Sequence, residues 1–488
     1  MSDDDVVFVT PDARVTRGEY RSRLARAVTV LRALGVGPGG GIGVALQNCP
    51  QFFELIAAAS ALGAKAVPVA WRLKQEEVAY LIADSGIGLV FHDASSAAAM
   101  AGLPAVSLDE YERRLAVAEP DTGAPAGGPA FNMELYSSGT TGRPKAIERS
   151  APTAEEMARL QSGSMNFLGI MGVGGPDEIH MMCGPLYHSQ PIGFATQALN
   201  AGQRVVMMQG GFDAETCLAT IARENVTWIT CVPTHLFRIL SLPDEVRARY
   251  DLSSLKAVLH SAAPCPRDVK QAIMALLPPG VVWEIYGGTE GSMTMISPAE
   301  ALDKPGSVGK AFPAGTTLRI LDDAGNELPP GVPGLVYGTP LMRFRYRGAQ
   351  VLDDQTWQGD LYTLGDVGYL DEDGFLFITD RKKDMIISGG ANIYPAEVEA
   401  TLFNHPAVGD AAVIGVPDPQ WGEKVKAIVE LRGAASEEEI IGFCREHLAH
   451  YKCPGSVDFV TRLPRDPNGK VRKRELREPY WAEAGRAI

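Results

Sequence analysis

The sequence predicts an α/β protein with a large N-terminal part and a smaller C-terminal part. In the first hundred residues, apolar strand-like runs alternate with segments of helical spacing, which favours an open, mainly parallel sheet with flanking helices. From residue 318 onward, short strand-like runs separated by turns predict a β-rich subdomain. With 488 residues, the chain is too long for one hydrophobic core, so two or more domains are expected.

The N-terminal elements follow from apolar periodicity and from glycine and proline punctuation. Helices are expected at residues 17–34, 51–62 and 74–85, and strands at 41–46, 65–69 and 88–92. A link rich in Pro, Gly and Ala at 119–130 leads to strands at 131–136 and 146–149. Beyond it we expect a helix at 153–166 and strands at 178–183, 227–231 and 257–260.

The remaining elements complete the β-rich subdomain and a small α+β C-terminal domain. Strands are expected at 318–323, 335–337, 360–370 and 375–380, with turns at 323–326 and 371–374. The C-terminal order is helix 396–404, strands 408–416 and 424–431, helix 437–448 and strand 456–460.

Composition and charge exclude several classes of protein. The net charge of −14 argues against a nucleic-acid-binding surface, although a local basic patch can still hold an anionic ligand. No apolar run is long enough to span a bilayer, and the acidic N-terminus is the reverse of a secretory signal. The seven cysteines form no C-x-x-C pair, which predicts reduced thiols, no zinc site and a cytoplasmic location. The oligomeric state is left open, a homodimer included.

The most distinctive stretch is residues 136–145, which read Y-S-S-G-T-T-G-R-P-K. Its hydroxyls, its glycines and the final Lys145 suit a loop that wraps the oxygens of a polyphosphate. A flexible polar loop is the simpler alternative, but it does not need the rigidity and charge of Arg143-Pro144-Lys145. A P-loop is rejected because the pattern G-x-x-x-x-G-K-[ST] is absent.

A second stretch, residues 283–292, reads W-E-I-Y-G-G-T-E-G-S. Tyr286 can stack on a purine, and Gly287 and Gly288 allow a substrate to approach the backbone closely. Thr289 can donate to an α-phosphate, and Glu290 can hold Mg²⁺, which prefers oxygen ligands and phosphate co-ligands. Exposed glutamates are common, so the ligand interpretation depends on the neighbouring Y-G-G and on the upstream loop.

Two further stretches complete a pattern that resembles the adenylate-forming enzymes: acyl- and aryl-CoA synthetases, adenylation domains of peptide synthetases, and beetle luciferase. These are residues 381–395 (R-K-K-D-M-I-I-S-G-G-A-N-I-Y-P) and 463–473 (L-P-R-D-P-N-G-K-V-R-K). The four stretches occur in the family's order and span nearly the whole chain. Ala146 stands where many members carry glycine, and the segment after the strand at 257–260 is poorer in glycine than usual.

The resemblance implies roles for individual residues. Lys145, His188, Thr289, Glu290 and Lys470 would be catalytic: Lys470 would reach the reacting carboxylate, and His188 would line or gate the acyl pocket. Glu290 and Thr141 would hold the metal. The expected nucleotide- and coenzyme-binding residues are Ser137, Ser138, Gly139, Thr140, Thr141, Gly142, Lys145, Ser261, Ala262, Ala263, Pro264, Tyr286, Gly287, Gly288, Thr289, Asp366, Arg381, Lys383, Ser388, Gly389 and Gly390.

Within that set, Ser261 to Pro264 would flank the adenine. Asp366 would bind the ribose, and Arg381 the ribose or a phosphate. Without the resemblance, Asp366 is an ordinary turn residue, and His188, like His235, is an ordinary structural histidine.

The resemblance also implies two domains, residues 1–382 and 383–488, with a hinge at Lys383. The second would be a mobile lid that presents Lys470 in one conformation. In the other, Ser388, Gly389 and Gly390 would line a pantetheine channel. The alternative for the tail around Lys470 is a solvated basic segment.

The implied reaction is ATP- and Mg²⁺-dependent activation of a carboxylic acid, followed by transfer to coenzyme A. No acidic residue lies within residues 187–191, which disfavours an amino acid and leaves a fatty, aryl or bulky cyclic acid. No carrier domain follows Ile488, which favours free coenzyme A as the acceptor. Two alternatives stay open: a stand-alone enzyme that loads a carrier protein, and a non-catalytic acyl-nucleotide binder.

Overall fold

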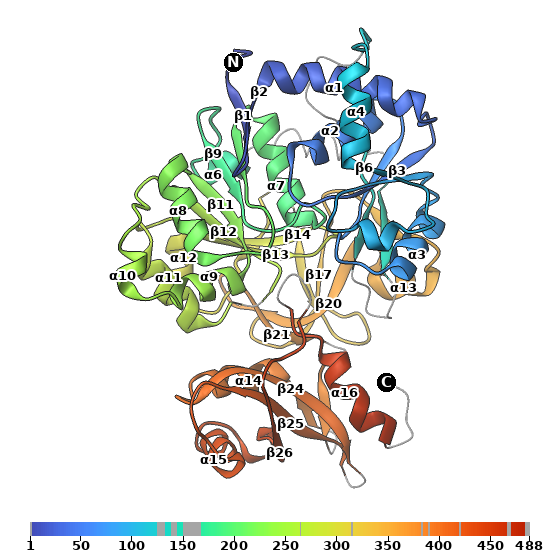
Figure 1. Cartoon of the computed structure of the whole chain (residues 1–488). Helices are drawn as coiled ribbons and strands as arrows, with labels where there is room; N and C mark the ends of the chain where they lie inside the picture. Colours follow the sequence, from blue (N-terminus) through green and yellow to red (C-terminus); the bar gives the residue numbers. More distant parts are fainter. Residues whose placement is uncertain are drawn as a thin grey trace.

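The computed structural model describes residues 2–123, 132–137, 144–149, 167–263, 265–313, 316–381, 384–388, 391–418, 421–465 and 470–483. Within these residues the chain forms a large part and a smaller C-terminal part, which lies below the large part in Figure 1. None of the described helices is both long and apolar enough to cross a membrane.

A nine-stranded sheet forms the centre of the large part. In sheet order its strands are β15 (Lys310–Ala311), β14 (Ser292–Ile296), β13 (Val282–Gly287), β12 (Ala257–His260), β11 (Trp228–Cys231), β9 (Ile179–Met182), β10 (Arg204–Met207), β1 (Val6–Val9) and β2 (Arg14–Thr16). The central strands from β13 to β1 run parallel, and the edge strands are antiparallel. The carboxyl ends of the parallel strands therefore meet along one edge of the sheet.

A second, four-stranded parallel sheet consists of β4 (Lys65–Pro68), β3 (Gly41–Ala45), β5 (Leu89–His92) and β6 (Ala105–Ser107). Helices around these sheets include α1 (Arg17–Ala33), α2 (Pro50–Ala61), α3 (Gln75–Ser85), α4 (Leu108–Val117), α7 (Ser189–Asn200), α8 (Ala214–Glu224), α9 (Pro233–Leu240) and α11 (Arg267–Leu276). Their boundaries have local causes. Thr16 and Glu19 form a capping box at the start of α1, and α3 ends at Gly86 with φ 69°.

One antiparallel sheet forms the β-rich subdomain that the sequence predicts, and a second joins β18 (Phe344–Tyr346) to the strands that flank the predicted phosphate loop. The first contains β16 (Leu318–Leu321), β17 (Gly334–Gly338), β20 (Leu361–Leu370), β19 (Trp357–Gln358) and β21 (Leu376–Arg381). The other contains β18, β8 (Lys145–Arg149) and β7 (Leu135–Ser137). This second sheet joins segments nearly 200 residues apart in the sequence.

The C-terminal part has its own sheet and core. Its strands are β23 (Ala391–Ile393), β22 (Ile386–Ser388), β25 (Gly422–Leu431), β24 (Val408–Asp418) and β26 (Ser456–Val460), and its helices are α14 (Pro395–Phe403), α15 (Glu437–His447) and α16 (Lys473–Glu483). Buried residues from β24, β25, α14 and α15 pack into one hydrophobic cluster. The mixed α/β fold with a separate α+β C-terminal part is thus confirmed.

The structure also contains elements that the sequence pattern did not predict. Strand β1 pairs in parallel with β10, and α16 follows the last expected strand. The helix expected at 153–166 and most of the link at 119–130 fall outside the described residues.

Candidate active site

The strands that flank the predicted phosphate loop form an antiparallel hairpin. Ser137 on β7 lies opposite Lys145 on β8, and the Ser137 hydroxyl donates to the Lys145 carbonyl at 3.5 Å. Both ends of the loop are therefore held in register. The loop residues Ser138, Gly139, Thr140, Thr141 and Gly142 lie outside the described residues.

Helix α3 and a distant arginine anchor this hairpin. The Tyr80 hydroxyl donates to the Pro144 carbonyl at 3.0 Å, and the Tyr136 hydroxyl donates to Asp84 at 2.6 Å. The Arg347 guanidinium donates to Glu134, just before β7, and to Glu148, on β8, each at 2.8 Å. Because Arg347 contacts the segment before β7 and also β8, it holds the two sides of the hairpin together.

The predicted metal and α-phosphate residues lie in the tight turn between β13 and β14. Gly288 and Gly291 close this turn by reciprocal backbone hydrogen bonds of 3.0 and 3.2 Å, which leaves Thr289 and Glu290 at its centre. A Cβ atom at Gly287 would lie 2.5 Å from the Gly291 carbonyl oxygen, and one at Gly288 would collide with Glu290 Oε2. Close packing against the backbone thus requires glycine at 287, whereas a side chain at 288 would displace the Glu290 carboxylate.

Side chains from three other segments converge on this turn. The Tyr346 hydroxyl donates to Glu290 Oε1 at 2.7 Å, and Arg149 Nη2 donates to the Thr289 carbonyl at 2.6 Å. The Ser189 and Thr289 hydroxyls are 3.4 Å apart. Burial and the Glu290 carboxylate raise the pKa of Tyr346, so its phenol stays protonated and remains a donor.

This cluster fits the binding of a magnesium ion together with a phosphate. The described residues contain no group of three or more His, Cys, Asp or Glu side chains arranged to hold a metal by themselves. Glu290 supplies a hard carboxylate oxygen beside the space that the missing Gly288 side chain leaves. Mg²⁺ is commonly held by one or two carboxylates plus substrate phosphates, so a single glutamate is enough.

The predicted ribose contacts meet on neighbouring strands. Asp366 on β20 lies opposite Arg381 at the end of β21. The Tyr286 hydroxyl donates to Asp366 Oδ2 at 2.6 Å, and Asp366 is only 4% exposed. Tyr286, assigned to the purine, and Asp366, assigned to the ribose, are therefore in direct contact.

Ser261, Ala262 and Ala263 follow β12 at the carboxyl edge of the large sheet, beside the end of β13. Ala262 has φ 74°, in the left-handed region that favours glycine. The residue next to them in the predicted adenine segment, Pro264, lies outside the described residues.

His188 lies at the same edge of the sheet, immediately before α7. Its ring centroid is 4.3 Å from that of Tyr187. Desolvation lowers the pKa of His188 to about 4, so the imidazole is neutral at pH 7. A neutral imidazole can exchange hydrogen bonds with a substrate without adding a charge.

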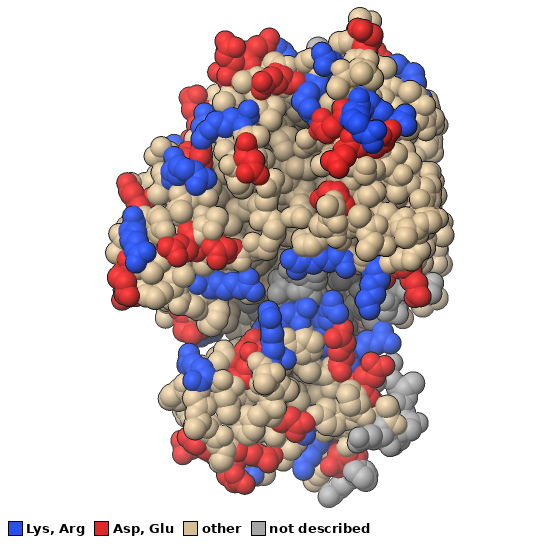
Figure 2. All heavy atoms as spheres, viewed as in Figure 1, with Lys and Arg blue, Asp and Glu red and all other residues tan. Residues whose placement is uncertain are grey.

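The predicted lid residues belong to the C-terminal part. Lys470 adjoins Val471, which forms an isolated β-bridge with Arg465, and Ser388 pairs with Gly422 between β22 and β25. Lys383, Gly389 and Gly390 lie outside the described residues. Figure 2 shows Lys and Arg side chains on both sides of the depression between the two parts.

Asp384 is the first described residue after the predicted hinge. It pairs with Arg477 of α16 at 3.3 Å, and its carbonyl accepts a second bond from Arg477 at 3.1 Å. From Asp384 onward, the chain is thus tied to the C-terminal part.

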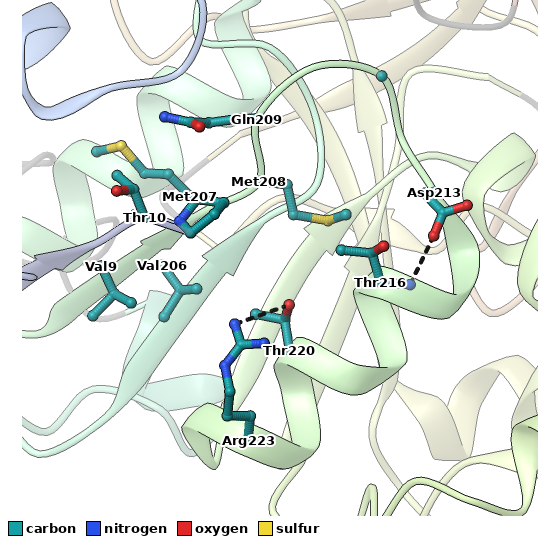
Figure 3. A pocket seen from close by; sticks show the side chains of 12 residues that line it. Val9, Thr10, Val206, Met207, Met208, Gln209, Asp213, Thr216, Thr220 and Arg223 are labelled. Atoms are coloured by element: carbon teal, nitrogen blue, oxygen red, sulfur yellow. Dashed lines mark hydrogen bonds between the residues drawn. The ribbon is translucent and has the colours of Figure 1, made fainter. Parts of the chain in front are cut away.

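A separate cavity of about 120 Å³ lies beyond the ends of β1 and β10, next to α8. Figure 3 shows Asp213 bonded to the Thr216 backbone and Arg223 directed at Thr220. None of the predicted site residues lines this cavity. The cavity also lies at the carboxyl edge of the sheet, but β12, β11 and β9 separate its strands from β13, which leads into the Thr289–Glu290 turn.

Sequence reasoning missed Arg149, Ser189, Tyr346 and Tyr362, which surround the Thr289–Glu290 turn. One signal was available for Arg149. Alternate residues of a strand share a face, so Lys145 and Arg149 point to the same side of β8. The tyrosines gave no local signal, because their positions follow from the folding of the β-rich subdomain.

Comparison with known proteins gives one consistent family. A sequence profile described as AMP-binding enzyme matches residues 1–342, and one described as AMP-binding enzyme C-terminal domain matches residues 397–470. The chain is 34% identical to a feruloyl-CoA synthase from Amycolatopsis sp, over 96% of this chain and 94% of that protein. It is 32% identical to the fatty acid–[acyl-carrier-protein] ligase ScoC from Streptomyces coeruleorubidus, over 96% and 91%.

A solved structure is similar to this chain over nearly its whole length. The o-succinylbenzoate coenzyme A synthetase MenE from Bacillus subtilis, in complex with ATP and magnesium ion, superposes with a TM-score of 0.82. It is 28% identical, and the match covers 96% of each chain.

Proposed function

This chain belongs to the family of AMP-binding enzymes, and on that premise we propose that it joins a carboxylic acid to the thiol of coenzyme A at the expense of ATP. The observation that carries the proposal is the meeting of two stretches 140 residues apart. The strand that begins with Lys145 reaches, through Arg149, the turn that presents Thr289 and Glu290. Such a site can hold the phosphates of ATP between a lysine and a metal-binding carboxylate.

The first step is adenylation. A carboxylate oxygen attacks the α-phosphorus of ATP, the bond to the β-phosphate bridging oxygen breaks, and pyrophosphate leaves with that electron pair. Both reactants are anionic, so the enzyme must neutralise charge and hold the groups in line. Lys145 would hold the β- and γ-phosphates, and Thr289 would donate to the α-phosphate.

A metal ion and Lys470 would supply the remaining positive charge opposite the phosphates and the carboxylate. Glu290 and Thr141 would hold Mg²⁺, which would screen the phosphate charge. Lys470 would bridge the acid and the α-phosphate.

The second step is transfer to a thiol. The sulfur attacks the acyl carbon, the bond to AMP breaks with its electron pair on AMP, and the thiol proton passes to solvent. We propose a domain boundary at residue 382 and a hinge at Lys383, so that the C-terminal part can withdraw Lys470 and admit the thiol. The tie between Asp384 and Arg477 supports this division, because it fixes the chain after the hinge to the C-terminal part.

The acid is proposed to be aryl, fatty or bulky cyclic. The segment from Tyr187 to Pro191 carries no carboxylate that could pair with the α-amine of an amino acid. One relative is a feruloyl-CoA synthase, an enzyme named for an aromatic acid. A carrier protein as acceptor is the second candidate, favoured by the similarity to ScoC.

The test is ATP–pyrophosphate exchange over a panel of aryl, fatty, cyclic and amino acids, with mass-spectrometric detection of acyl-CoA. Exchange and thioester with one acid class are expected. Exchange without thioester would replace coenzyme A by a carrier protein. Nucleotide binding without exchange for any acid would favour an acyl-nucleotide binder and overturn the proposal.

A further inference from the structure

The turn at Gly288–Gly291 has one peptide unit that the turn itself does not fix. In a four-residue turn, the outer residues bond to each other, while the central peptide has no partner within the turn. Here the central peptide joins Thr289 to Glu290. Its rotation would redirect the Glu290 side chain, whereas the Thr289 hydroxyl keeps a second contact, with the Ser189 hydroxyl 3.4 Å away.

Arg149 supplies the missing partner. Its Nη2 donates to the Thr289 carbonyl at 2.6 Å, the carbonyl of that central peptide. Because guanidinium is planar and carries its donors in a rigid fork, this bond fixes the orientation of the carbonyl more firmly than a single ammonium donor would.

Arg149 also belongs to a group of side chains around Glu290. The Arg149 charge interacts with the Glu290 carboxylate, and Arg149 itself is exposed. Tyr362 is fully buried, and its hydroxyl has no hydrogen-bond partner among the described residues. A Cβ atom at Gly291 would lie 3.0 Å from that hydroxyl, so Tyr362 packs directly under the turn.

The position of Arg149 on its strand gives this contact a consequence for the phosphates. Lys145 stands at the start of β8 and Arg149 at its end, on the same face. A rigid strand therefore connects the lysine of the phosphate loop to the turn that carries the metal-binding carboxylate.

We propose that Arg149 is a positioning residue that locks the Thr289–Glu290 peptide and thereby sets the spacing between Lys145 and Glu290 around a bound magnesium–ATP complex. This role rests on the proposed function. It acts through Glu290, so its loss affects nucleotides that carry the metal more than it affects AMP.

The test is calorimetric titration of Arg149→Met with Mg·ATP and, separately, with AMP, in the absence of any acid. We expect Mg·ATP affinity to fall about tenfold or more, the scale of one hydrogen bond to a charged group. AMP affinity should change less than about threefold, because the Ser189 hydroxyl beside Thr289 stays in place. Arg149→Lys should recover part of the loss, because it keeps the charge and one donor.

Arg345→Met is the matched control. Arg345 lies on β18 in the same sheet, pairs with Glu148 and has a side chain that is 74% exposed. The Arg345→Met variant should bind Mg·ATP and AMP as tightly as the wild type does. A double variant Arg149→Met, Glu290→Gln should bind Mg·ATP no worse than Glu290→Gln alone.

Three results would contradict either the positioning role of Arg149 or the proposed function. A folded Arg149→Met that binds Mg·ATP as tightly as the wild type overturns the positioning role. An equal loss for Mg·ATP and AMP also overturns it, because that result indicates a general disturbance of the fold. A wild-type protein that binds neither nucleotide contradicts the proposed function itself.

Discussion

In the large part, the residues proposed to face the nucleotide are held from several sides, whereas Lys470 belongs to a separately packed C-terminal part. Tyr80 and Arg347 anchor the hairpin of β7 and β8, which flanks the predicted phosphate loop (the phosphate hairpin), and Arg149 contacts the Thr289–Glu290 turn. Val471, the neighbour of Lys470, packs instead on a small cluster with Leu463 and Ile414 in the C-terminal part. Under the proposed mechanism, the nucleotide site is therefore formed within the large part before the reaction, and the C-terminal part supplies the lysine.

Replacing Lys470 by alanine should produce the largest effect. We expect pyrophosphate exchange to fall by about a hundred- to a thousandfold, the scale for removing one preorganised charge from a reaction site. Transfer from a supplied acyl-adenylate to coenzyme A should change little, because the proposed mechanism uses the lysine only in adenylation. Lys473→Ala is the control, because Lys473 pairs with Glu399 inside the C-terminal part at 2.8 Å. Full exchange activity in Lys470→Ala would remove the lysine from the mechanism.

Replacing Arg347 by methionine should weaken the anchor of the phosphate hairpin. It would leave the carboxylates of Glu134 and Glu148, on opposite sides of the hairpin, without their shared partner. Lys65 still pairs with Glu134 and Arg345 with Glu148, so the loss should cost about 2 kcal/mol of unfolding free energy, measured by urea denaturation.

The matched control for that experiment is Arg319→Met. Arg319 pairs with Glu327 at 2.8 Å, but both side chains are about half exposed. Its loss should cost less than about 1 kcal/mol. Equal effects of the two substitutions would show that the hairpin is not specially anchored.

Acid should destabilise the large part through its buried histidines. Burial lowers the pKa of His180 and His235 to about 3 and of His188 and His260 to about 4, below the ordinary 6.5. The unfolded chain therefore binds more protons than the folded chain between about pH 6.5 and these values, so stability falls as the pH drops through that window. Each fully buried histidine contributes up to about 1.4 kcal/mol per pH unit.

Thermal unfolding at pH 7.5, 6.0 and 5.0 measures this effect. The midpoint should fall progressively, and His260→Gln should reduce the slope. A midpoint that stays constant from pH 7.5 to 5.0 would contradict the burial of neutral imidazoles in the large part.

The smallest effect concerns the strained residue of the predicted adenine segment. Ala262 adopts φ 74°, which glycine adopts without steric cost. Ala262→Gly should change the unfolding free energy by no more than about 1 kcal/mol, because relief of strain is offset by the greater entropy of glycine in the unfolded chain. Ala263→Gly is the comparison and should only destabilise. A loss larger than about 2 kcal/mol in Ala262→Gly would mean that its methyl group has a packing role.

The sequence predicted correctly those helices and strands that a local pattern of apolar and turn residues determines. The strand at 456–460 matches β26, and the helix expected at 74–85 matches α3 within one residue. The glycines at 287 and 288 were expected for a different reason, the close approach of a substrate, whereas the structure shows Gly287 packed against the backbone of its own turn.

The contacts around the site were not predictable in the same way. The bond from Arg149 to Thr289 spans 140 residues, and the clamp by Arg347 on Glu134 spans 213. Such partners depend on how the β-rich subdomain folds against the large sheet, which no periodicity encodes. The parallel pairing of β1 with β10 was missed for the same reason.

The most direct test of the division between the two parts is one titration series with Mg·ATP on Lys470→Ala and Glu290→Gln. If the nucleotide site is complete within the large part, Lys470→Ala should bind Mg·ATP as the wild type does, whereas Glu290→Gln should bind it at least about tenfold more weakly. The opposite result, with binding lost in Lys470→Ala and retained in Glu290→Gln, would contradict the account.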